Sequence, residues 1–262
     1  MESIVSKKNR MKIIYPDGTV IEGKKDLKTW TDYLNITDLD FTGKRVLDIA
    51  TDEGWWAFWS EMQGAEYVEA SDVETGQDYD WGAEKDWEWI NWLNSIRTSK
   101  QVFDKHYQNL NSNIVYKKES IYDIKGKFDF IFCHGLLYHL RHPLLAFDTV
   151  SRSTQGFAIF ETFTDIEEDQ MIASSKFYRT TELSNAISNW TGATTAGWCS
   201  WMRDAGFKDV YYTTPGFSGK TRQMLVGVKD TKYKQRFDNC ENLHYCDDEF
   251  WNIVFEKTKY RG

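Results

Sequence analysis

Residues 45–59 of the chain read RVLDIATDEGWWAFW, and this stretch indicates the class of fold. Residues 45–50 form a short run with β-branched residues that is typical of a strand. Beyond Gly54, four large apolar residues recur at i, i+3, i+4 and i+7, which places them on one face of a helix. These are Trp55, Phe58, Trp59 and Met62. A strand that turns directly into a helix predicts the first unit of an α/β fold.

Strands and helices alternate along the rest of the chain. We predict further strands at 67–71, 114–116, 128–133 and 156–161, a helix that begins at His142-Pro143, and a helix over 194–205. The runs 210–213 and 223–228 are expected to close the sheet as an antiparallel pair. This alternation predicts an α/β, Rossmann-like sheet of seven mostly parallel strands with helices on both faces.

The chain is expected to have three parts. Residues 1–40 form a preface, in which two β-prone runs flank Pro16-Asp17-Gly18 and predict a small β-hairpin, followed by a short helix. Residues 41–228 form the main α/β domain. Residues 229–262 are charged and aromatic, and we expect a C-terminal appendage there, with a helix or an arm.

The composition excludes several classes of protein. The 262 residues include 12 Trp, 14 Tyr and 16 Phe but only 3 Pro, which excludes a disordered or fibrous chain. No stretch approaches the roughly 18 apolar residues of a membrane span, and the start MESIVSKKNRMK lacks the apolar block of a secretory signal. Four cysteines are too few for a disulfide scaffold. We therefore expect a cytoplasmic protein. Its net charge of −8 disfavours a nucleic-acid partner without excluding one.

Four segments should meet where the parallel strands end, which is where ligands bind in open α/β sheets. They are residues 48–54, 71–72, 119–123 and 134–139. Asp72 closes the second strand and could accept both hydroxyls of an adenosyl ribose, although an acid there could also simply cap a loop. A dinucleotide is disfavoured, because the first loop retains only Gly54 of the Gly-x-Gly-x-x-Gly turn. A ligand with ribose and adenine but no phosphate fits better, and S-adenosylmethionine is such a ligand.

Two motifs carry a family resemblance. Residues 46–58 resemble the first motif of class I S-adenosylmethionine-dependent methyltransferases. Residues 128–144, FDFIFCHGLLYHLRHPL, are similar to the branch that contains the bacterial enzymes that alkylate the wobble uridine of tRNA, in which a Gly-x-Leu-Tyr-His run followed by Pro-Leu recurs. The resemblance covers about residues 43–228.

The resemblance implies a set of cofactor-binding residues. Asp72 would hold the ribose, and Ile121 and Tyr122 would border the adenine. Arg222 would bind the carboxylate if the cofactor were carboxy-S-adenosylmethionine, with Lys28 as the nearest lysine that could complete that site. The full set is Asp48, Ala50, Asp52, Gly54, Asp72, Ile121, Tyr122, His134 and Arg222.

The catalytic candidates are Tyr138 and His139. The tRNA enzymes use a tyrosine near the transferred group at the position of Tyr138, and His139 and His134 are placed to act as general bases. Correct positioning of donor and acceptor can supply roughly 7–11 kcal/mol of the barrier, so methyl transfer does not require a base. His139 could equally bind the backbone, and Tyr138 could equally be a packing residue.

Two residues depart from the first motif, which usually has glycine where this chain has Ala50 and Asp52. A β-carbon is expected to fit there only if φ is negative, and it would narrow the approach of the cofactor. Asp52 could instead face the positively charged part of the cofactor. Two hypotheses follow: a methyltransferase that acts on a small molecule or sugar, with tRNA as the second choice, or a non-catalytic cofactor-binding or interaction module.

We expect no metal site. The spacings of His134, His139 and His142 match no common zinc pattern. A second cluster could bind zinc only if a fourth ligand came from elsewhere, and ordinary cysteines are favoured. It consists of Cys240, His244 and Cys246.

A tryptophan-rich segment could form a stacking wall for a flat acceptor. It contains Trp81, Trp87, Trp89 and Trp92. Two of these lie on a helical stripe that is typical of a core. Trp56 and Trp87 lie off such stripes and are the better candidates for a pocket or an interface.

Overall fold

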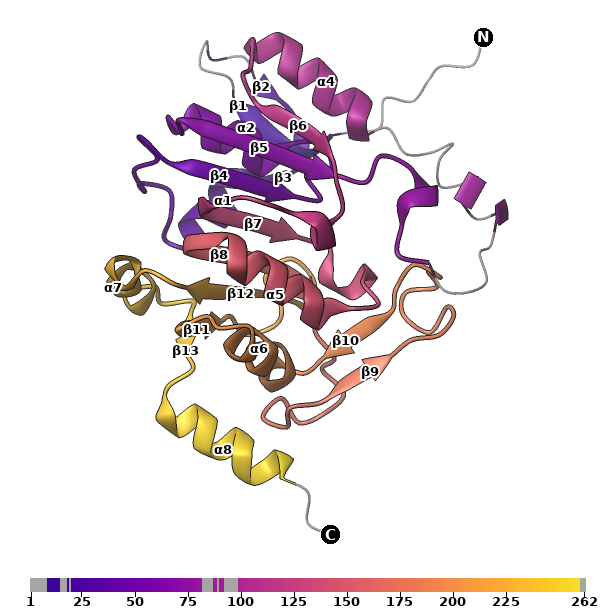
Figure 1. Cartoon of the computed structure of the whole chain (residues 1–262), viewed down its shortest axis with the longest axis vertical. Helices are drawn as coiled ribbons and strands as arrows, with labels where there is room; N and C mark the ends of the chain where they lie inside the picture. Colours follow the sequence, from indigo (N-terminus) through magenta and orange to yellow (C-terminus); the bar gives the residue numbers. More distant parts are fainter. Residues whose placement is uncertain are drawn as a thin grey trace.

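The computed structural model describes residues 9–14, 18, 20–81, 87–88, 90–91 and 99–259, and its centre is one twisted sheet (Figure 1). This sheet has eight strands in the order β13-β11-β12-β8-β7-β4-β5-β6. Their bounds are β4 (Arg45–Ile49), β5 (Tyr67–Asp72), β6 (Val115–Lys118), β7 (Phe128–His134), β8 (Thr154–Phe163), β11 (Asp209–Tyr212), β12 (Arg222–Val228) and β13 (His244–Tyr245).

The topology confirms the predicted Rossmann-like sheet. The five strands β4 to β8 run parallel to one another. Strand β12 is antiparallel to β8, and β11 is antiparallel to β12. The strand order reverses at β4, with β5 and β6 on one side and β7 and β8 on the other, so the carboxyl end of β4 is a switch point. The eighth strand, β13, is a two-residue edge strand from the C-terminal region.

The predicted helices form where the sequence places them. They are α1 (Leu27–Tyr33), α2 (Trp55–Met62), α5 (Pro143–Ser153) and α6 (Thr195–Asp204). Helix α5 begins with Pro143 because its first turn needs no backbone donor there. Helix α6 begins after Thr194, whose side-chain oxygen accepts the N–H of Gly197 at 3.1 Å.

Further helices lie in segments where the sequence placed no helix, apart from the C-terminal region, for which it predicted a helix or an arm. They are α4 (Ser99–Leu110), α7 (Lys234–Asp238) and α8 (Asp248–Thr258). Helix α4 lies at the end of the molecule opposite to α8 (Figure 1). Within the described residues, no helix is long and apolar enough to span a membrane.

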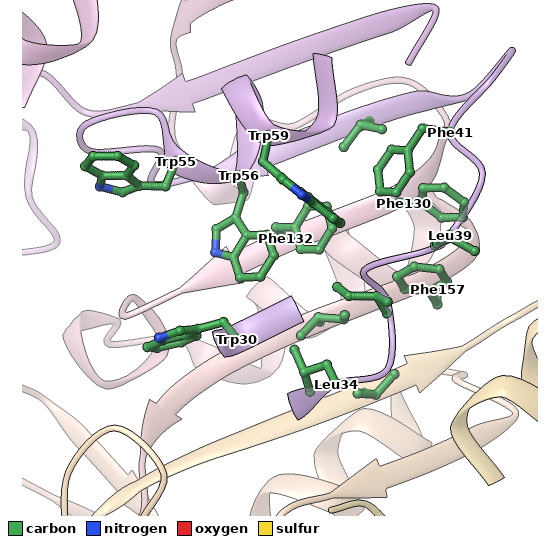
Figure 2. Close-up of a cluster of buried hydrophobic side chains, with 14 of the residues drawn as sticks. Trp30, Leu34, Leu39, Phe41, Trp55, Trp56, Trp59, Phe130, Phe132 and Phe157 are labelled. Atoms are coloured by element: carbon green, nitrogen blue, oxygen red, sulfur yellow. The ribbon is translucent and has the colours of Figure 1, made fainter. Parts of the chain in front are cut away.

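Two hydrophobic clusters cover the two faces of the sheet. Helices α1, α2, α4 and α7 contribute to one cluster, and α5, α6 and α8 contribute to the other. In the first cluster the indole of Trp56 stacks on Phe132, with ring centroids 4.5 Å apart. Figure 2 shows the rings of Trp30, Trp55 and Trp56 at one end of this cluster and Phe130 at the other.

The preface contains a small separate sheet with the order β2-β1-β3. Strands β1 (Asn9–Ile14) and β2 (Val20–Ile21) pair antiparallel, which confirms the hairpin, and β3 (Gly23–Asp26) adds in parallel to β1. Leu34 and Ile36 are fully buried in the same cluster as α2. The division of the chain at residue 40 stays a prediction.

A second small sheet lies between β8 and α6. Strands β9 (Ser175–Phe177) and β10 (Thr191–Ala193) pair antiparallel. The segment that they enclose contacts the loop after β7, because the N–H of Trp190 donates to the carbonyl of Tyr138 at 2.8 Å. The hydroxyl of Thr191 also donates to the carbonyl of Leu140 at 3.0 Å. These bonds hold residues 188–191 against the edge of the sheet where the predicted site lies.

Candidate active site

A cavity of about 1140 Å³ lies at the carboxyl ends of the central parallel strands. Its volume exceeds the roughly 300–1,000 Å³ that is usual for one drug-sized ligand, so a nucleoside and a second molecule both have room. All but one of the predicted site residues line it. They are Asp48, Ala50, Asp52, Asp72, Ile121, Tyr122, His134, Tyr138, His139 and Arg222. Gly54 lies behind the wall, at the start of α2.

Asp48 fixes the loop between β4 and α2. Its Oδ2 accepts the hydroxyl of Thr51 at 2.6 Å and the N–H of Ala57 at 3.1 Å. Gly54 precedes the helix and has no side chain to cap it, so Asp48 supplies the oxygen that a capping residue would provide. Burial raises the pKa of Asp48 to about 7.

Ala50 and Asp52 adopt the left-handed conformation, with φ of 54° and 51°. The expectation that a β-carbon would fit there only at negative φ is therefore wrong. Neighbouring hydrogen bonds impose the conformation, since the N–H of Thr51 donates to Ser71 O at 3.0 Å and the N–H of Asp52 donates to Asp72 Oδ2 at 2.9 Å. Ala50 and Asp52 thus keep the backbone conformation typical of glycine although both carry a β-carbon.

Gly54 also has a positive φ, of 90°. A β-carbon on Gly54 would lie 2.4 Å from a ring carbon of Phe58 and 2.6 Å from one of Phe103. Glycine at this position is therefore required by packing beneath the loop.

Asp72 lies at the tip of β5 and is almost fully buried. The next strand, β6, brings Glu119 to the same place, and the N–H of Glu119 donates to the carbonyl of Asp72 at 3.1 Å. Glu119 Oε2 is buried and has no hydrogen-bond partner among the described residues, and burial raises the pKa of Glu119. A buried acceptor without a partner fits a ligand that brings a donor. The sequence placed residues 119–123 here but did not single out Glu119.

Tyr122 is held by a loop from the other side of the cavity. Its hydroxyl donates to Asp80 Oδ2 at 2.6 Å, and the same oxygen accepts the N–H of Arg141 at 2.7 Å. Burial, and then the bond to Asp80, raises the pKa of Tyr122. Ile121 is buried and lines the cavity beside Tyr122.

The tryptophans divide between wall and surface. Trp56 and Trp81 line the cavity, and the indole N–H of Trp81 donates to the carbonyl of Gly76 at 2.5 Å. Trp87 is 56 % exposed and does not line the cavity. Trp89 and Trp92 lie outside the described residues.

Arg222 reaches the cavity with its charge already paired. Its Nε and Nη2 donate to the two carboxylate oxygens of Glu161 at 2.5 and 2.6 Å, and its guanidinium lies 4.5 Å from the ring centre of Tyr138. Lys28 pairs with Asp32 on the exposed face of α1 and does not line the cavity. Lys24 and Lys25, from β3, line it instead.

His139 has a defined tautomer. Its Nδ1 lies 2.9 Å from the carbonyl oxygen of Ser188, which can only accept, so Nδ1 carries the proton and Nε2 keeps a lone pair in the neutral ring. Burial lowers the pKa of His139 to about 4. The hydrogen bond from Nδ1 to the backbone of Ser188 is therefore compatible with a role of Nε2 as a general base.

His134 ends β7, and its imidazole lies near two indoles. Its ring centre is 4.6 Å from that of Trp56 and 5.6 Å from that of Trp30. Burial, with the positive charges of Arg222 and Lys25, lowers the pKa of His134 to about 3. Both ring nitrogens are buried without a hydrogen-bond partner among the described residues.

The side chains of the two histidine and cysteine clusters considered as metal sites do not come together in the structure. His142 is exposed at the start of α5 and does not line the cavity. Cys240 and Cys246 pack into clusters on opposite faces of the sheet. In the part of the chain that is described, no three metal-binding side chains are grouped.

The cavity wall carries more carboxylic side chains than lysines and arginines. Among the described residues that line it, the lysines and arginines are Lys24, Lys25 and Arg222, and the carboxylic residues are Asp48, Asp52, Glu53, Asp72, Asp78, Asp80, Glu119 and Glu161. The carboxylic residues come from the ends of β4 to β6 and from residues 78–80, with Glu161 alone on β8. The lysines and the arginine come from β3 and β12. One side of the cavity is therefore suited to a cation.

A family model described as a methyltransferase domain matches residues 24–212. The chain belongs to the methyltransferase domain family. The prediction of an S-adenosylmethionine-dependent methyltransferase of class I is confirmed at this level. Among curated proteins, the chain is 28% identical over 176 residues to a tRNA U34 carboxymethyltransferase from Campylobacter hominis, a match that covers 65% of this chain and 53% of that protein. The chain thus spans about half the length of this relative.

Solved structures share the fold of this methyltransferase domain. A magnesium protoporphyrin IX methyltransferase from Synechocystis with bound S-adenosylmethionine matches with a TM-score of 0.51 and 14% identity, over 78% of each chain. An S-adenosylmethionine-dependent methyltransferase from Mesorhizobium loti matches with a TM-score of 0.51 and 13% identity, over 76% of this chain and 96% of that one. These likenesses confirm the Rossmann-like fold.

Replacing Ala50 by glycine should stabilise the protein. A left-handed non-glycine residue costs roughly 1–2 kcal/mol, and the greater freedom of glycine in the unfolded chain offsets part of the gain, so we expect the free energy of unfolding to rise by about 1 kcal/mol. Urea denaturation of Ala50→Gly measures it. Ala205→Gly, at a helix end with φ of −64°, is the control and should lower stability. Equal losses in both variants would contradict the assigned loop conformation.

Proposed function

We propose that the chain transfers the methyl group of S-adenosylmethionine to a small molecule that carries no negative charge. The observation that supports this most is the acidic cavity at the switch point of the sheet, which is large enough for two ligands. The same wall contains the predicted cofactor residues and the imidazole of His139, which can accept a proton.

The described residues fit the cofactor by their chemistry. Asp72, at the tip of β5, would hold the ribose hydroxyls, and the unpartnered Oε2 of Glu119 would accept a donor from the adenine. Loop 50–54, fixed by Asp48, would border the methionine part. The excess of acids on this side of the wall favours a ligand with a sulfonium and an ammonium group.

The reaction needs little from the protein beyond position and a proton acceptor. When bound, the cofactor supplies a methyl group whose C–S bond breaks, with the electron pair left on sulfur, as the acceptor oxygen forms the new C–O bond. His139 would take the hydroxyl proton on Nε2, since Ser188 holds the Nδ1 proton in place. Tyr138, beside His139, would help to position the acceptor.

The charge of the wall bears on the choice of acceptor. Binding of RNA relies on lysine and arginine that neutralise phosphates. Here the acids on the described wall outnumber the bases, and Arg222 is already paired with Glu161. A small molecule or sugar is therefore the first proposal, and tRNA, suggested by the Campylobacter relative, is the second.

The cofactor assignment is tested by calorimetric titration with S-adenosylhomocysteine. Wild-type protein should bind with a dissociation constant on the order of 1 μM, equivalent to about −8.2 kcal/mol. Asp72→Ala should weaken binding at least about tenfold, because a hydrogen bond to a charged group contributes roughly 1.5–3 kcal/mol. Asp104→Ala, on the exposed face of α4, should bind like wild type. No heat from wild type at millimolar ligand would support a non-catalytic interaction module, and unchanged affinity of Asp72→Ala would place the ribose elsewhere.

The acceptor class is tested with cofactor that is radiolabelled on its methyl group. Wild-type protein is incubated separately with the small-molecule fraction and with the RNA fraction of a cell extract. We expect label in the small-molecule fraction only, and none with Asp72→Ala. Label in RNA that is sensitive to ribonuclease would reverse the order of the two acceptors.

Carboxymethyl transfer is a second candidate, because Arg222 and Tyr138 line the cavity where the resemblance implies a site for the extra carboxylate. The bonds from Arg222 to both oxygens of Glu161 disfavour it, since that carboxylate already occupies the guanidinium edge.

We expect wild-type protein to prefer the ordinary cofactor over carboxy-S-adenosylmethionine, and Arg222→Leu to keep this preference. Competition binding with the two cofactors measures it, and Arg222→Lys is the control that retains the charge. A preference of wild type for the carboxylated cofactor that is lost in Arg222→Leu would establish carboxymethyl transfer instead.

A further inference from the structure

His134 is a partly buried side chain whose two ring nitrogens are buried, and the cofactor contacts proposed above do not involve it, although the resemblance implied a cofactor-binding role. Its imidazole lies at the end of β7 on the cavity wall, near Trp30 and Trp56. Neither ring nitrogen has a hydrogen-bond partner among the described residues. Folded proteins rarely leave buried donors and acceptors unpaired, so these two atoms point to a ligand that supplies both an acceptor and a donor.

A second group of polar atoms surrounds a point next to His134. Gly135 has a φ of 71°, and a β-carbon built on it would lie 3.7 Å from Arg222 Nη2, 3.9 Å from Glu161 Oε2 and 3.9 Å from the hydroxyl of Tyr138. Glycine leaves this space open. Glu161 is paired directly with His134 across β7 and β8, so the carboxylate and the imidazole belong to the same part of the wall.

The charges around this space nearly cancel. Glu161 neutralises Arg222 through two hydrogen bonds, and burial keeps His134 uncharged at neutral pH. The Glu161–Arg222 pair and the neutral imidazole therefore add no net charge that would attract an anion. The positive charge that remains nearby is that of Lys25, whose ammonium lies 4.9 Å from the ring centre of Trp30, and it disfavours a cation.

We propose that His134 and the Glu161–Arg222 pair bind the acceptor, and that the acceptor is an uncharged ring with adjacent hydroxyl groups. This inference rests on the proposed function. The two ring nitrogens of His134 point in different directions, so one hydroxyl bonds to one of them, as donor or acceptor, and the adjacent hydroxyl donates to Glu161. Trp30 and Trp56 are mostly buried, and the parts of their indoles that line the cavity form an apolar wall for the ring.

The test uses protein saturated with S-adenosylhomocysteine and labelled with ¹⁵N in its histidines. Two rings with adjacent hydroxyls serve as probes, methyl β-D-glucopyranoside for a sugar and catechol for a phenol, and benzoate is the anionic control. Ligands of this size bind with dissociation constants on the order of 1 mM. We expect one of the two diols to bind and to shift the imidazole signals of His134, and benzoate to bind at least tenfold more weakly.

Variants of His134 separate ligand recognition from packing. His134→Leu should weaken diol binding at least tenfold and leave the affinity for S-adenosylhomocysteine within about twofold of wild type, because a ligand group that loses its partner costs about this much. His134→Asn, which keeps a donor and an acceptor, should retain most of the affinity. His244→Leu, on the exposed edge strand β13 and away from the cavity wall, is the matched control and should change neither affinity.

Each outcome decides the proposal. Binding of the glucoside identifies a sugar-like acceptor, and binding of catechol identifies a phenol. The proposal is overturned if neither diol binds, if benzoate binds best, or if His134→Leu binds the diol as wild type does. Should His134→Leu fail to fold, Glu161→Gln and His134→Asn provide the comparison, and Glu161→Gln is expected to weaken diol binding. Failure of wild type to bind S-adenosylhomocysteine would instead refute the proposed function.

Discussion

Two carboxylates at the ends of neighbouring parallel strands hold the loop on which the candidate site depends. Asp48 receives hydrogen bonds from Thr51 and from the first turn of α2, and Asp72 receives the N–H of Asp52. Neither acid could be replaced by an apolar residue without leaving buried donors unpaired. The bonds also explain why Ala50 and Asp52 tolerate the left-handed conformation. Strain of this kind persists only where the surroundings over-determine the backbone, and it is concentrated at functional sites.

The aromatic cluster serves both the fold and the cavity. Phe41, Phe130 and Phe157 pack at the closed end, whereas Trp30, Trp55 and Trp56 extend the same cluster to the cavity wall (Figure 2). Indoles are wide enough to close the space between α1, α2 and the sheet while leaving an open volume beside them. The cavity is therefore lined by the edge of a rigid core, and its shape is set before any ligand binds.

The sequence predicted those parts of the fold in which local pattern and burial agree. The central strands and α2, α5 and α6 have strong apolar periodicity, and each was predicted. Helix α4 was missed although Phe103, Tyr107 and Leu110 recur at i, i+4 and i+7, because most of its other residues are polar or charged. Strands β9 and β10 were missed because each has three residues, which is too short for an alternating pattern.

The same distinction holds for the candidate site. Asp72 was found because an acid that ends a buried strand stands out. Glu161 ends the predicted strand 156–161 in the same way but was not singled out, and in the structure it lies inside β8, which continues to Phe163. Its partner, Arg222, is 61 positions away, and no local pattern links the two. Lys28 was chosen by its distance along the chain, whereas the pairing of β3 with β1 brings Lys24 and Lys25 to the wall. Contacts of this kind depend on strand order, which local sequence patterns do not specify.

The arrangement of charge follows from the order of strands in the sheet. The carboxyl end of β4, at the switch point, and the ends of β5 and β6, on one side of it, bring Asp48, Asp72 and Glu119 together. Strand β12, on the other side, brings Arg222, which Glu161 on β8 neutralises. A cationic donor is therefore favoured on one side and an uncharged acceptor on the other. His134, at the end of β7, and His139, shortly after it, lie between the two sides, and burial keeps both rings neutral. The electrostatic preference of each side is therefore left intact.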